Sequence, residues 1–322
     1  MATIGHQKQR EFLKRIAEKG KIPHAFLFYG QEQLGKKTLA IEFVKYLNCK
    51  ETVRPCQVCR SCQDIQKGLY PDFNLIKPET SQTIQISQIR DLIWKLSLRS
   101  YSAPFKVAVI DKAHLMTQAA QNSFLKILEE PKGKTLLILI TEYSEMLLPT
   151  ILSRVQKLRF SAVKNKEIES YLINQGASKS NAEYLSLLSL GRPGMALNFL
   201  LDSQKLKNQE KLISDLIKIS NSDLAFRFEY AKTLSKMTSD ALTIDRILET
   251  WLRYLRNIFL SRLTKESSRR RTSISLKRDD VFNHYSLSKL KNILRLIQST
   301  NFLISTTNVN SKLALEVLLM EV

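Results

Sequence analysis

The sequence predicts an α/β domain with a parallel sheet over residues 1–162, followed by two all-helical domains over residues 163–205 and 206–322. In the first domain, short apolar runs alternate with helical periodicity, and near-continuous apolar strands are typical of a parallel sheet covered on both faces. After residue 163 the strand signal stops, and Gly191–Gly194 interrupts a bundle of short helices before longer amphipathic helices begin. With 322 residues, 43% of them apolar and 25% charged, the chain is long enough for this division.

Strands and helices are predicted from apolar runs and apolar spacing. The expected strands are residues 25–29, 72–77, 106–110, 135–141 and 155–160. Helices are expected after the first strand and over about residues 86–96, 117–129, 224–236, 241–263, 287–303 and 309–319. Residues 264–280 have almost no apolar content and are predicted to form an exposed basic loop, which is either solvated or in contact with DNA. The two tryptophans, Trp94 and Trp251, are predicted to lie in the core.

Composition limits the compartment and the partners. No apolar run is long enough to span a bilayer, and the N-terminal segment MATIGHQKQREF lacks the apolar core of a signal peptide, so a cytoplasmic protein without membrane contact is expected. The formal net charge is +20, from 50 basic and 30 acidic residues, which favours a polyanionic partner or a phosphate-rich environment. Because the charge is spread along the chain, general solubility is the alternative explanation.

Residues Gly30–Thr38, with the sequence GQEQLGKKT, match a phosphate-binding loop that lacks its magnesium ligand. Gly30, Gly35 and Lys36 complete the pattern G-x-x-x-x-G-K, but Lys37 stands where a working loop has Ser or Thr. The loop lies between a predicted strand and a predicted helix, as a cradle of backbone N–H groups requires. The alternative is an ordinary strand–turn–helix that binds no nucleotide.

A second part of a nucleotide site follows the predicted strand at residues 106–110. Asp111 stands where a Walker B strand has its metal-holding carboxylate, and Lys112 stands where an active ATPase has the carboxylate that polarises the attacking water. An ammonium group cannot accept that proton. Together, Lys37 and Lys112 predict an ATPase fold without hydrolysis, and they put the binding of ATP and Mg²⁺ by this chain in doubt. His114, just beyond, is expected to pack at the strand end.

All four cysteines fall within fourteen residues, in the spacing C-x₆-C-x₂-C-x₂-C, as Cys49, Cys56, Cys59 and Cys62. In a reducing compartment, four thiolates so close in sequence are typical of a tetrahedral structural zinc site. An iron–sulfur cluster and free thiols are the alternatives. The zinc would close the loop of residues 49–62 without taking part in catalysis.

The segment LKILEEP at Leu125–Pro131, after Ala119–Asn122, closely resembles a signature of bacterial DNA polymerase III clamp-loader subunits. Further matches in the family's order are Ile4–His6, His24–Ala25, the four-cysteine loop and Ser153–Arg154. The resemblance covers residues 4–200 and extends weakly through residues 251–253 and 308–315. It implies an AAA+ P-loop domain over residues 1–162, a helical lid over 163–205 and a helical collar for oligomerisation over 206–322.

The resemblance also implies roles for individual residues. Arg154 matches the arginine of the family's Ser-Arg-Cys motif, which acts in trans on the ATP of a neighbouring subunit. Val155 replaces the cysteine of that motif, which is not its charged group. Gly194 stands where active members have an arginine that senses their own γ-phosphate, and Arg192 is the nearest candidate to replace it. The loss of this sensor agrees with Lys37 and Lys112.

In the clamp-loader interpretation the chain is a non-hydrolysing stator within a DNA polymerase holoenzyme. The implied partners are the gamma/tau and delta subunits, the sliding clamp and primer-template DNA. One alternative is an active ATPase of the gamma/tau kind, in which Thr38 binds Mg²⁺ from a position shifted by one residue. The other is a zinc-containing nucleic-acid-binding protein unrelated to clamp loading.

Overall fold

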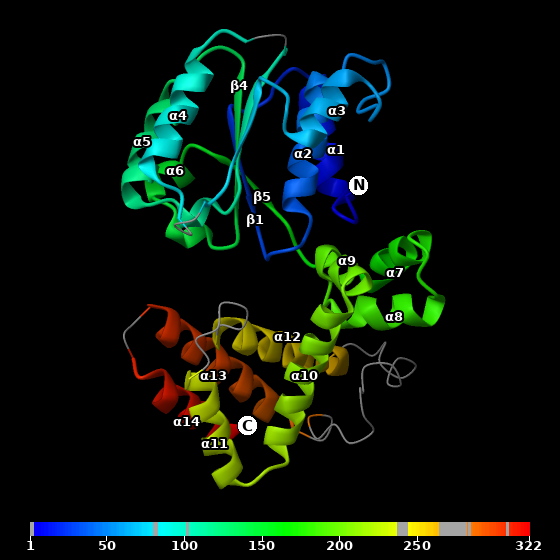
Figure 1. The fold of residues 1–322 in the computed structure, drawn as a ribbon, viewed down its shortest axis with the longest axis vertical. Coiled ribbons are helices and arrows are strands. Elements are labelled where there is room, and N and C mark those ends of the chain that lie inside the picture. Colours follow the sequence, from blue (N-terminus) through cyan, green and yellow to red (C-terminus); the bar gives the residue numbers. More distant parts are fainter. Residues whose placement is uncertain are drawn as a thin grey trace. The chain divides into compact units, whose positions relative to one another are not determined.

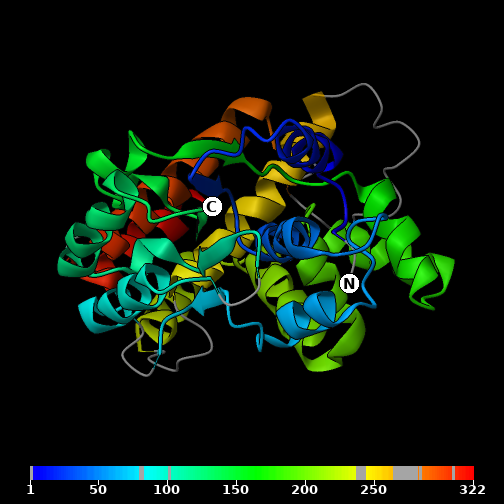
Figure 2. The same ribbon diagram turned by 90° about the horizontal axis from the view of Figure 1, so that it is seen from above.

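The computed structural model describes residues 3–79, 83–100, 103–236, 244–263, 282, 285–306 and 309–322. The chain divides into two compact units. Unit 1 is Met1–Tyr171 with Gly191–Met195, and unit 2 is Leu172–Leu190 with Ala196–Val322. Within the described residues, strands occur only in unit 1 and unit 2 is entirely helical (Figures 1 and 2). The division into 1–162, 163–205 and 206–322 stays a prediction.

Among the described residues, helices and strands are interspersed up to residue 159, and only helices follow. In chain order they are α1 (Gln7–Glu18), β1 (Ala25–Tyr29), α2 (Lys36–Asn48), α3 (Arg60–Lys67), β2 (Phe73–Ile76), α4 (Ile86–Ser97), β3 (Lys106–Ile110), α5 (Gln118–Glu129), β4 (Thr135–Thr141), α6 (Pro149–Leu152), β5 (Gln156–Arg159), α7 (Asn165–Asn174), α8 (Lys179–Leu188), α9 (Pro193–Leu201), α10 (Ser203–Ser220), α11 (Leu224–Lys236), α12 (Ile244–Leu263), α13 (Leu287–Thr306) and α14 (Ser311–Glu321). Each of the five predicted strands is present.

The sheet of unit 1 is parallel throughout, with the strand order β2-β3-β4-β1-β5. Side chains along a strand alternate between the two faces, so each apolar strand feeds two cores. On β1, Ala25 and Leu27 join a cluster with α4, α5 and α6, whereas Phe26 and Phe28 join a cluster with α1, α2 and α3. Figure 1 shows these two groups of helices on opposite sides of the sheet. This two-sided burial explains why the strands are almost continuously apolar.

The helices of unit 2 surround a core of their own. Helix α11 packs against α14, and α12 packs against both α10 and α13. Trp251 of α12 is fully buried, and its indole N–H donates to the carbonyl oxygen of Leu212 at 3.0 Å. The prediction of a core role for Trp251 is therefore confirmed.

The same prediction is wrong for Trp94, whose side chain is 62% exposed on α4. Helix α4 buries Ile89, Leu92 and Leu96 against the sheet. Successive helical residues are rotated by about 100°, so Trp94 falls outside the stripe that these three residues form.

Helices α1 and α3 were not among the predicted elements. Helix α1 has one fully buried residue, Leu13, and α3 is a short helix that begins within the cysteine-rich segment of residues 49–62. The predicted helix 241–263 is described from Ile244 onward, and the predicted basic loop 264–280 lies outside the described residues. In the described part of the chain, no helix combines the length and apolar composition needed to cross a bilayer.

Candidate functional site

The phosphate-loop segment lies at the edge of the sheet where the parallel strands end, the usual place for ligands in such folds. Gly30 follows β1, Asp111 follows β3 and Glu142 follows β4. Gly30 has φ 140°, and a Cβ there would clash with the carbonyl oxygen of Phe160. Gly35 has φ 91° and precedes the first residue of α2. Both predicted glycines thus hold backbone conformations that other residues rarely adopt.

Lys36, the first residue of α2, turns its ammonium group back onto the loop. Its Nζ donates to the carbonyl oxygen of Gly30 and, at 2.6 Å, to that of Gln31. The side chain is buried, and burial lowers the pKa of Lys36 to about 8, although Glu142, Glu32 and Asp111 oppose the shift. The lysine expected to contact phosphate is therefore engaged by the oxygens of its own loop.

Lys37 contacts Asp111, the carboxylate that the sequence predicts as a metal ligand. Its Nζ lies 3.0 Å from Oδ2 of Asp111, the residue at the Walker B position. Lys112 makes a second ion pair, with 3.4 Å between its Nζ and Oε1 of Glu32 in the loop. The two lysines predicted to replace the metal-binding and water-activating groups thus pair with acidic groups at the same sheet edge. Glu32 was not predicted as a site residue, because a variable loop position carries no motif signal.

These side chains line a cavity of about 260 Å³. Its charged residues are three lysines and three carboxylates, namely Lys36, Lys37, Lys112, Glu32, Asp111 and Glu142. Burial, followed by the negative charge of Glu32, raises the pKa of Glu142. The fixed charges nearly cancel, so the cavity lacks the strong positive field that attracts a nucleoside triphosphate.

His114 also lines this cavity and packs at the end of the strand region as predicted. Its Nδ1 lies 3.1 Å from the hydroxyl oxygen of Thr141. Burial, with the nearby charge of Lys112, lowers the pKa of His114 to about 4. The imidazole is therefore neutral at physiological pH and adds no charge to the site.

At the expected sensor position the structure has a close backbone contact. The Gly194 N–H donates to the carbonyl oxygen of Gln33 at 2.9 Å, and a Cβ at Gly194 would lie 3.0 Å from that oxygen. Arg192, the candidate replacement, is buried, and burial lowers its pKa to about 10, opposed by Glu142 and Glu32. The residues that line the cavity include Gly194 but not Arg192.

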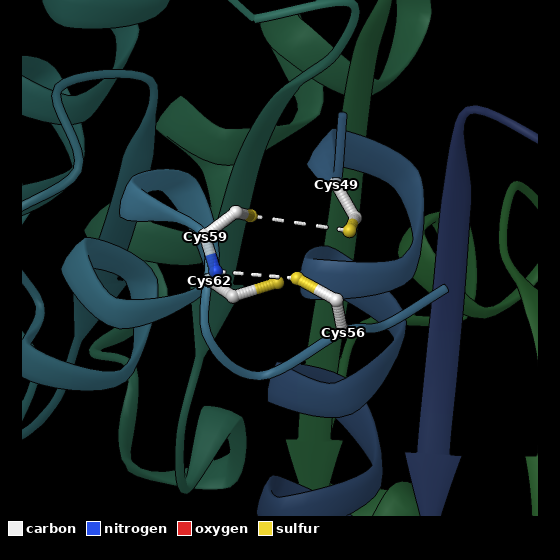
Figure 3. Close-up of side chains that lie close together, drawn as sticks. All are labelled: Cys49, Cys56, Cys59 and Cys62. Atoms are coloured by element: carbon white, nitrogen blue, oxygen red, sulfur yellow. Dashed lines mark hydrogen bonds between the residues drawn. The ribbon is translucent and has the colours of Figure 1, made fainter. Parts of the chain in front are cut away.

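The four cysteines converge on one point, as Figure 3 shows. Cys49 follows α2, Cys59 caps the start of α3 and Cys62 lies within α3, while Cys56 comes from the intervening loop. The four Sγ atoms all lie within 4.8 Å of one another, and those of Cys49 and Cys59 are 3.9 Å apart. A tetrahedral zinc with Zn–S bonds of 2.3 Å requires S–S separations of about 3.8 Å.

The surroundings shift the pKa values of Cys56 and Cys62 in opposite directions. The backbone N–H of Cys59 donates to Sγ of Cys56 at 3.2 Å and is the main cause that lowers the pKa of Cys56 to about 7. Burial raises the pKa of Cys62 to about 12. A divalent cation would offset the burial of the Cys62 thiolate, so the donor set fits a structural metal.

Arg154 follows α6 and is held by neighbours in its own unit. Its Nη2 lies 3.0 Å from Oε1 of Glu129, and its Nη1 donates to the carbonyl oxygen of Thr150 at 2.9 Å. The side chain is 38% exposed. The residues that line the cavity do not include Arg154. Glu129 was not predicted as a site residue, although it belongs to the LKILEEP segment.

Comparisons of the sequence with known proteins match subunits of DNA polymerase III. A family model described as "DNA polymerase III, delta subunit" matches residues 5–164. DNA polymerase III subunit delta' of Bacillus subtilis is 39% identical over 177 residues, which are 55% of this chain and 54% of that protein. The gamma subunit of Buchnera aphidicola is 29% identical over 260 residues, 74% of this chain and 71% of that one. The chain thus spans little more than half of the Bacillus relative.

Among solved structures, this chain aligns with a gamma-subunit-related protein of Thermotoga maritima. The alignment covers 97% of both chains, with 24% identity and a TM-score of 0.46.

Proposed function

This chain is a delta-prime-like member of the DNA polymerase III clamp-loader family, and from that premise we propose that it is the stator, the subunit that takes part in clamp loading without hydrolysing ATP. Membership of the family removes the alternative of a zinc-containing nucleic-acid-binding protein unrelated to clamp loading. The AAA+-type parallel sheet with its helical C-terminal region is the scaffold for this role.

One observation carries the proposal, namely the ion pair between Lys37 and Asp111. A working site needs a hydroxyl group and a carboxylate to hold Mg²⁺, and the metal in turn neutralises charge on the phosphates. Here an ammonium group stands in place of the hydroxyl and neutralises the carboxylate. Lys112 also cannot act as a base toward water. We therefore expect no intrinsic ATPase activity, and the binding of ATP and Mg²⁺ to the degenerate loop of Gly30, Gly35 and Lys36 stays in doubt.

The role assigned to Arg154 is to stabilise charge on the γ-phosphate of ATP bound to a neighbouring subunit. A guanidinium group is always charged and can contact two phosphate oxygens at once. The exposure of Arg154, and its position outside the chain's own cavity, support a role in trans. Such an arginine is typically worth about 10³-fold or more at the site it serves.

The test is a clamp-loader complex in which only the ATP site beside Arg154 can hydrolyse. Arg154→Ala should leave assembly unchanged, because an exposed arginine usually contributes under about 0.5 kcal/mol to stability. Turnover stimulated by DNA and clamp should fall by about 10³-fold. Unchanged turnover, with the variant subunit present in the complex by mass, would remove the arginine-finger role.

Partners and location follow from the same proposal. We propose that the chain assembles with gamma/tau and delta subunits in the DNA polymerase holoenzyme, and that the complex opens the sliding clamp and holds primer-template DNA in the cytoplasm. The excess of basic residues supports contact with DNA. Mixing the chain with the gamma/tau and delta subunits of its organism should give one hetero-oligomer by native mass measurement. Separate species at micromolar concentrations would contradict assembly.

A structural zinc held by Cys49, Cys56, Cys59 and Cys62 is part of the proposal. The convergence of the four Sγ atoms within 4.8 Å supports it, and the 3.9 Å between Cys49 and Cys59 is close to the edge of a tetrahedral thiolate site. The metal would join the end of α2 to α3 and would stabilise this connection without entering the reaction.

The second candidate is an active ATPase of the gamma/tau kind, and the similarity to a gamma subunit favours it. It requires Thr38, which also lines the cavity, to bind Mg²⁺ in place of Lys37. Successive helical residues point about 100° apart, which opposes that exchange. ATP turnover by the isolated chain on the order of 1 s⁻¹, abolished by Lys36→Ala, would decide for this candidate.

A further inference from the structure

Glu129 and Arg154 connect the ends of two helices that flank the sheet. Glu129 is the last residue of α5, and Arg154 comes two residues after α6. Oε1 of Glu129 lies 3.0 Å from Nη2 of Arg154, while the carbonyl oxygen of Thr150 accepts a hydrogen bond from Nη1. The hydroxyl oxygen of Ser153 lies 3.4 Å from the same Nη1. The guanidinium group is thus held from two sides by its own unit.

We expect this arrangement to contribute little to the stability of the fold. Both side chains are partly exposed, Arg154 by 38% and Glu129 by 51%, and ion pairs with such exposure contribute little to stability because water screens them. The contacts with Glu129 and Thr150 restrict the orientation of the Arg154 guanidinium group. Without them, this long side chain would occupy many rotamers. An arginine that must meet a phosphate on another molecule gains from such preorganisation, because less rotamer freedom is lost in the transition state.

We propose that Glu129 is a positioning residue for Arg154, which orients the guanidinium group toward the ATP of the neighbouring subunit. The inference rests on the proposed trans role of Arg154 and adds to it the residue that sets the geometry. Glu129 itself does not touch the nucleotide. Its carboxylate restrains one side of the guanidinium group, and the Thr150 carbonyl restrains the other.

The experiment uses the assembled complex in which only the site beside Arg154 can hydrolyse ATP. Glu129→Ala should lower kcat by about tenfold, because a misplaced catalytic group loses part of its effect. The KM for ATP should stay unchanged, since the neighbouring subunit supplies the binding contacts. Glu129→Gln keeps an oxygen acceptor and should retain more activity than Glu129→Ala. Glu130→Ala, a change of the next carboxylate in the chain, is the matched control and should leave kcat unchanged.

A double-mutant comparison separates positioning from a general structural effect. In complexes that already carry Arg154→Ala, Glu129→Ala should cause no further loss. An equal loss with and without Arg154, or an unchanged or higher kcat for Glu129→Ala alone, would overturn the inference. If Arg154→Ala itself has no effect, the proposed trans role fails. If Arg154→Ala lowers turnover and Glu129→Ala does not, only the positioning role fails.

Discussion

At the scale of single residues, Lys37 accounts for much of the chemistry of this site. Its ammonium group lies 3.0 Å from the Asp111 carboxylate, at the sheet edge where a working site would hold a metal ion. A fixed positive charge can neutralise Asp111, but it cannot coordinate phosphate oxygens as Mg²⁺ does. We therefore expect this site to bind a complex of Mg²⁺ and nucleotide weakly at most.

Lys37→Thr should therefore create Mg²⁺-dependent nucleotide binding. The substitution supplies the missing hydroxyl and frees Asp111, so the affinity for ATP in the presence of Mg²⁺ should rise about tenfold or more, a change of about 1.4 kcal/mol. Titration calorimetry with and without Mg²⁺ measures it. Lys132→Thr, just before β4 and at the opposite end of the strands, removes the same charge and should have no effect. Equal ATP affinities of Lys37→Thr and the unsubstituted chain would contradict this account.

Lys36 should make stability depend on pH above neutrality. Its pKa is about 8 in the folded chain against 10.5 ordinarily, so between these values the unfolded chain binds the proton and the folded chain does not. The free energy of unfolding should then rise with pH from 8 to 10.5, by up to about 3 kcal/mol, and stay lower below pH 8.

The measurement is the difference in unfolding free energy between the unsubstituted chain and Lys36→Met, by urea titration at several pH values. Taking the difference removes the titration of other groups, because they are common to both chains. A difference that does not change between pH 8 and 10.5 would show that the carbonyl oxygens of Gly30 and Gln31 stabilise the charged form as well as water does.

At the scale of elements, the cysteine-rich segment joins α2 to α3. Cys49 follows the last residue of α2, and Cys59 and Cys62 lie at the start of α3. Helix α3 has eight residues, too few to be stable by itself in water. Its position against the sheet therefore depends on Ile65, which is buried in the core of unit 1, and on the zinc proposed to join the four thiols.

Removing one of these thiols should loosen this connection and little else. Cys59→Ser should abolish the binding of one zinc per chain and increase hydrogen exchange over residues 49–67, while the five strands stay protected. Elemental analysis and hydrogen-exchange mass spectrometry provide the two measurements. Lys67→Ser, an exposed change in the same helix, is the control. Iron in the purified chain, or full protection of residues 49–67 without metal, would refute the structural zinc.

At the scale of the whole molecule, the two units have separate hydrophobic cores. The core of unit 1 lies on both faces of the parallel sheet, whereas that of unit 2 includes Trp251, whose side chain is fully buried. Trp251 also packs against Tyr230, with ring centroids 6.3 Å apart. Damage to one core should therefore leave the other core packed.

Trp251→Ala should destabilise unit 2 by about 3–5 kcal/mol, through the cavity it leaves and the lost hydrogen bond to Leu212. Hydrogen exchange should increase in α10, α12 and α13 and stay low in the strands of unit 1. Trp94→Ala, which removes an exposed tryptophan, should change stability by less than about 0.5 kcal/mol. Uniform loss of protection in both units after Trp251→Ala would mean that they unfold as one.

Local patterns in the sequence determined the strands, the two glycines of the phosphate loop and the metal-binding potential of the cysteines. An apolar run, a glycine in a tight turn and closely spaced thiols are each defined by neighbouring residues. They can therefore be recognised in the sequence without knowledge of contacts between distant segments. The parallel sheet also brings Asp111 to the edge that holds Gly30, because the ends of parallel strands meet there. The sequence also shows directly that Lys37 stands in place of a hydroxyl residue and Lys112 in place of a second carboxylate.

Only the tertiary structure decided which side chains meet. The pairing of Lys37 with Asp111 depends on the order β3-β4-β1, and the pairing of Glu129 with Arg154 depends on how the ends of α5 and α6 come together. The sequence likewise did not predict that Lys36 donates hydrogen bonds to its own loop, or that Trp94 is exposed. The physical reason is that a charge or an aromatic ring is placed by contacts between segments distant in the chain, whereas helices and strands are indicated by periodicity within one segment.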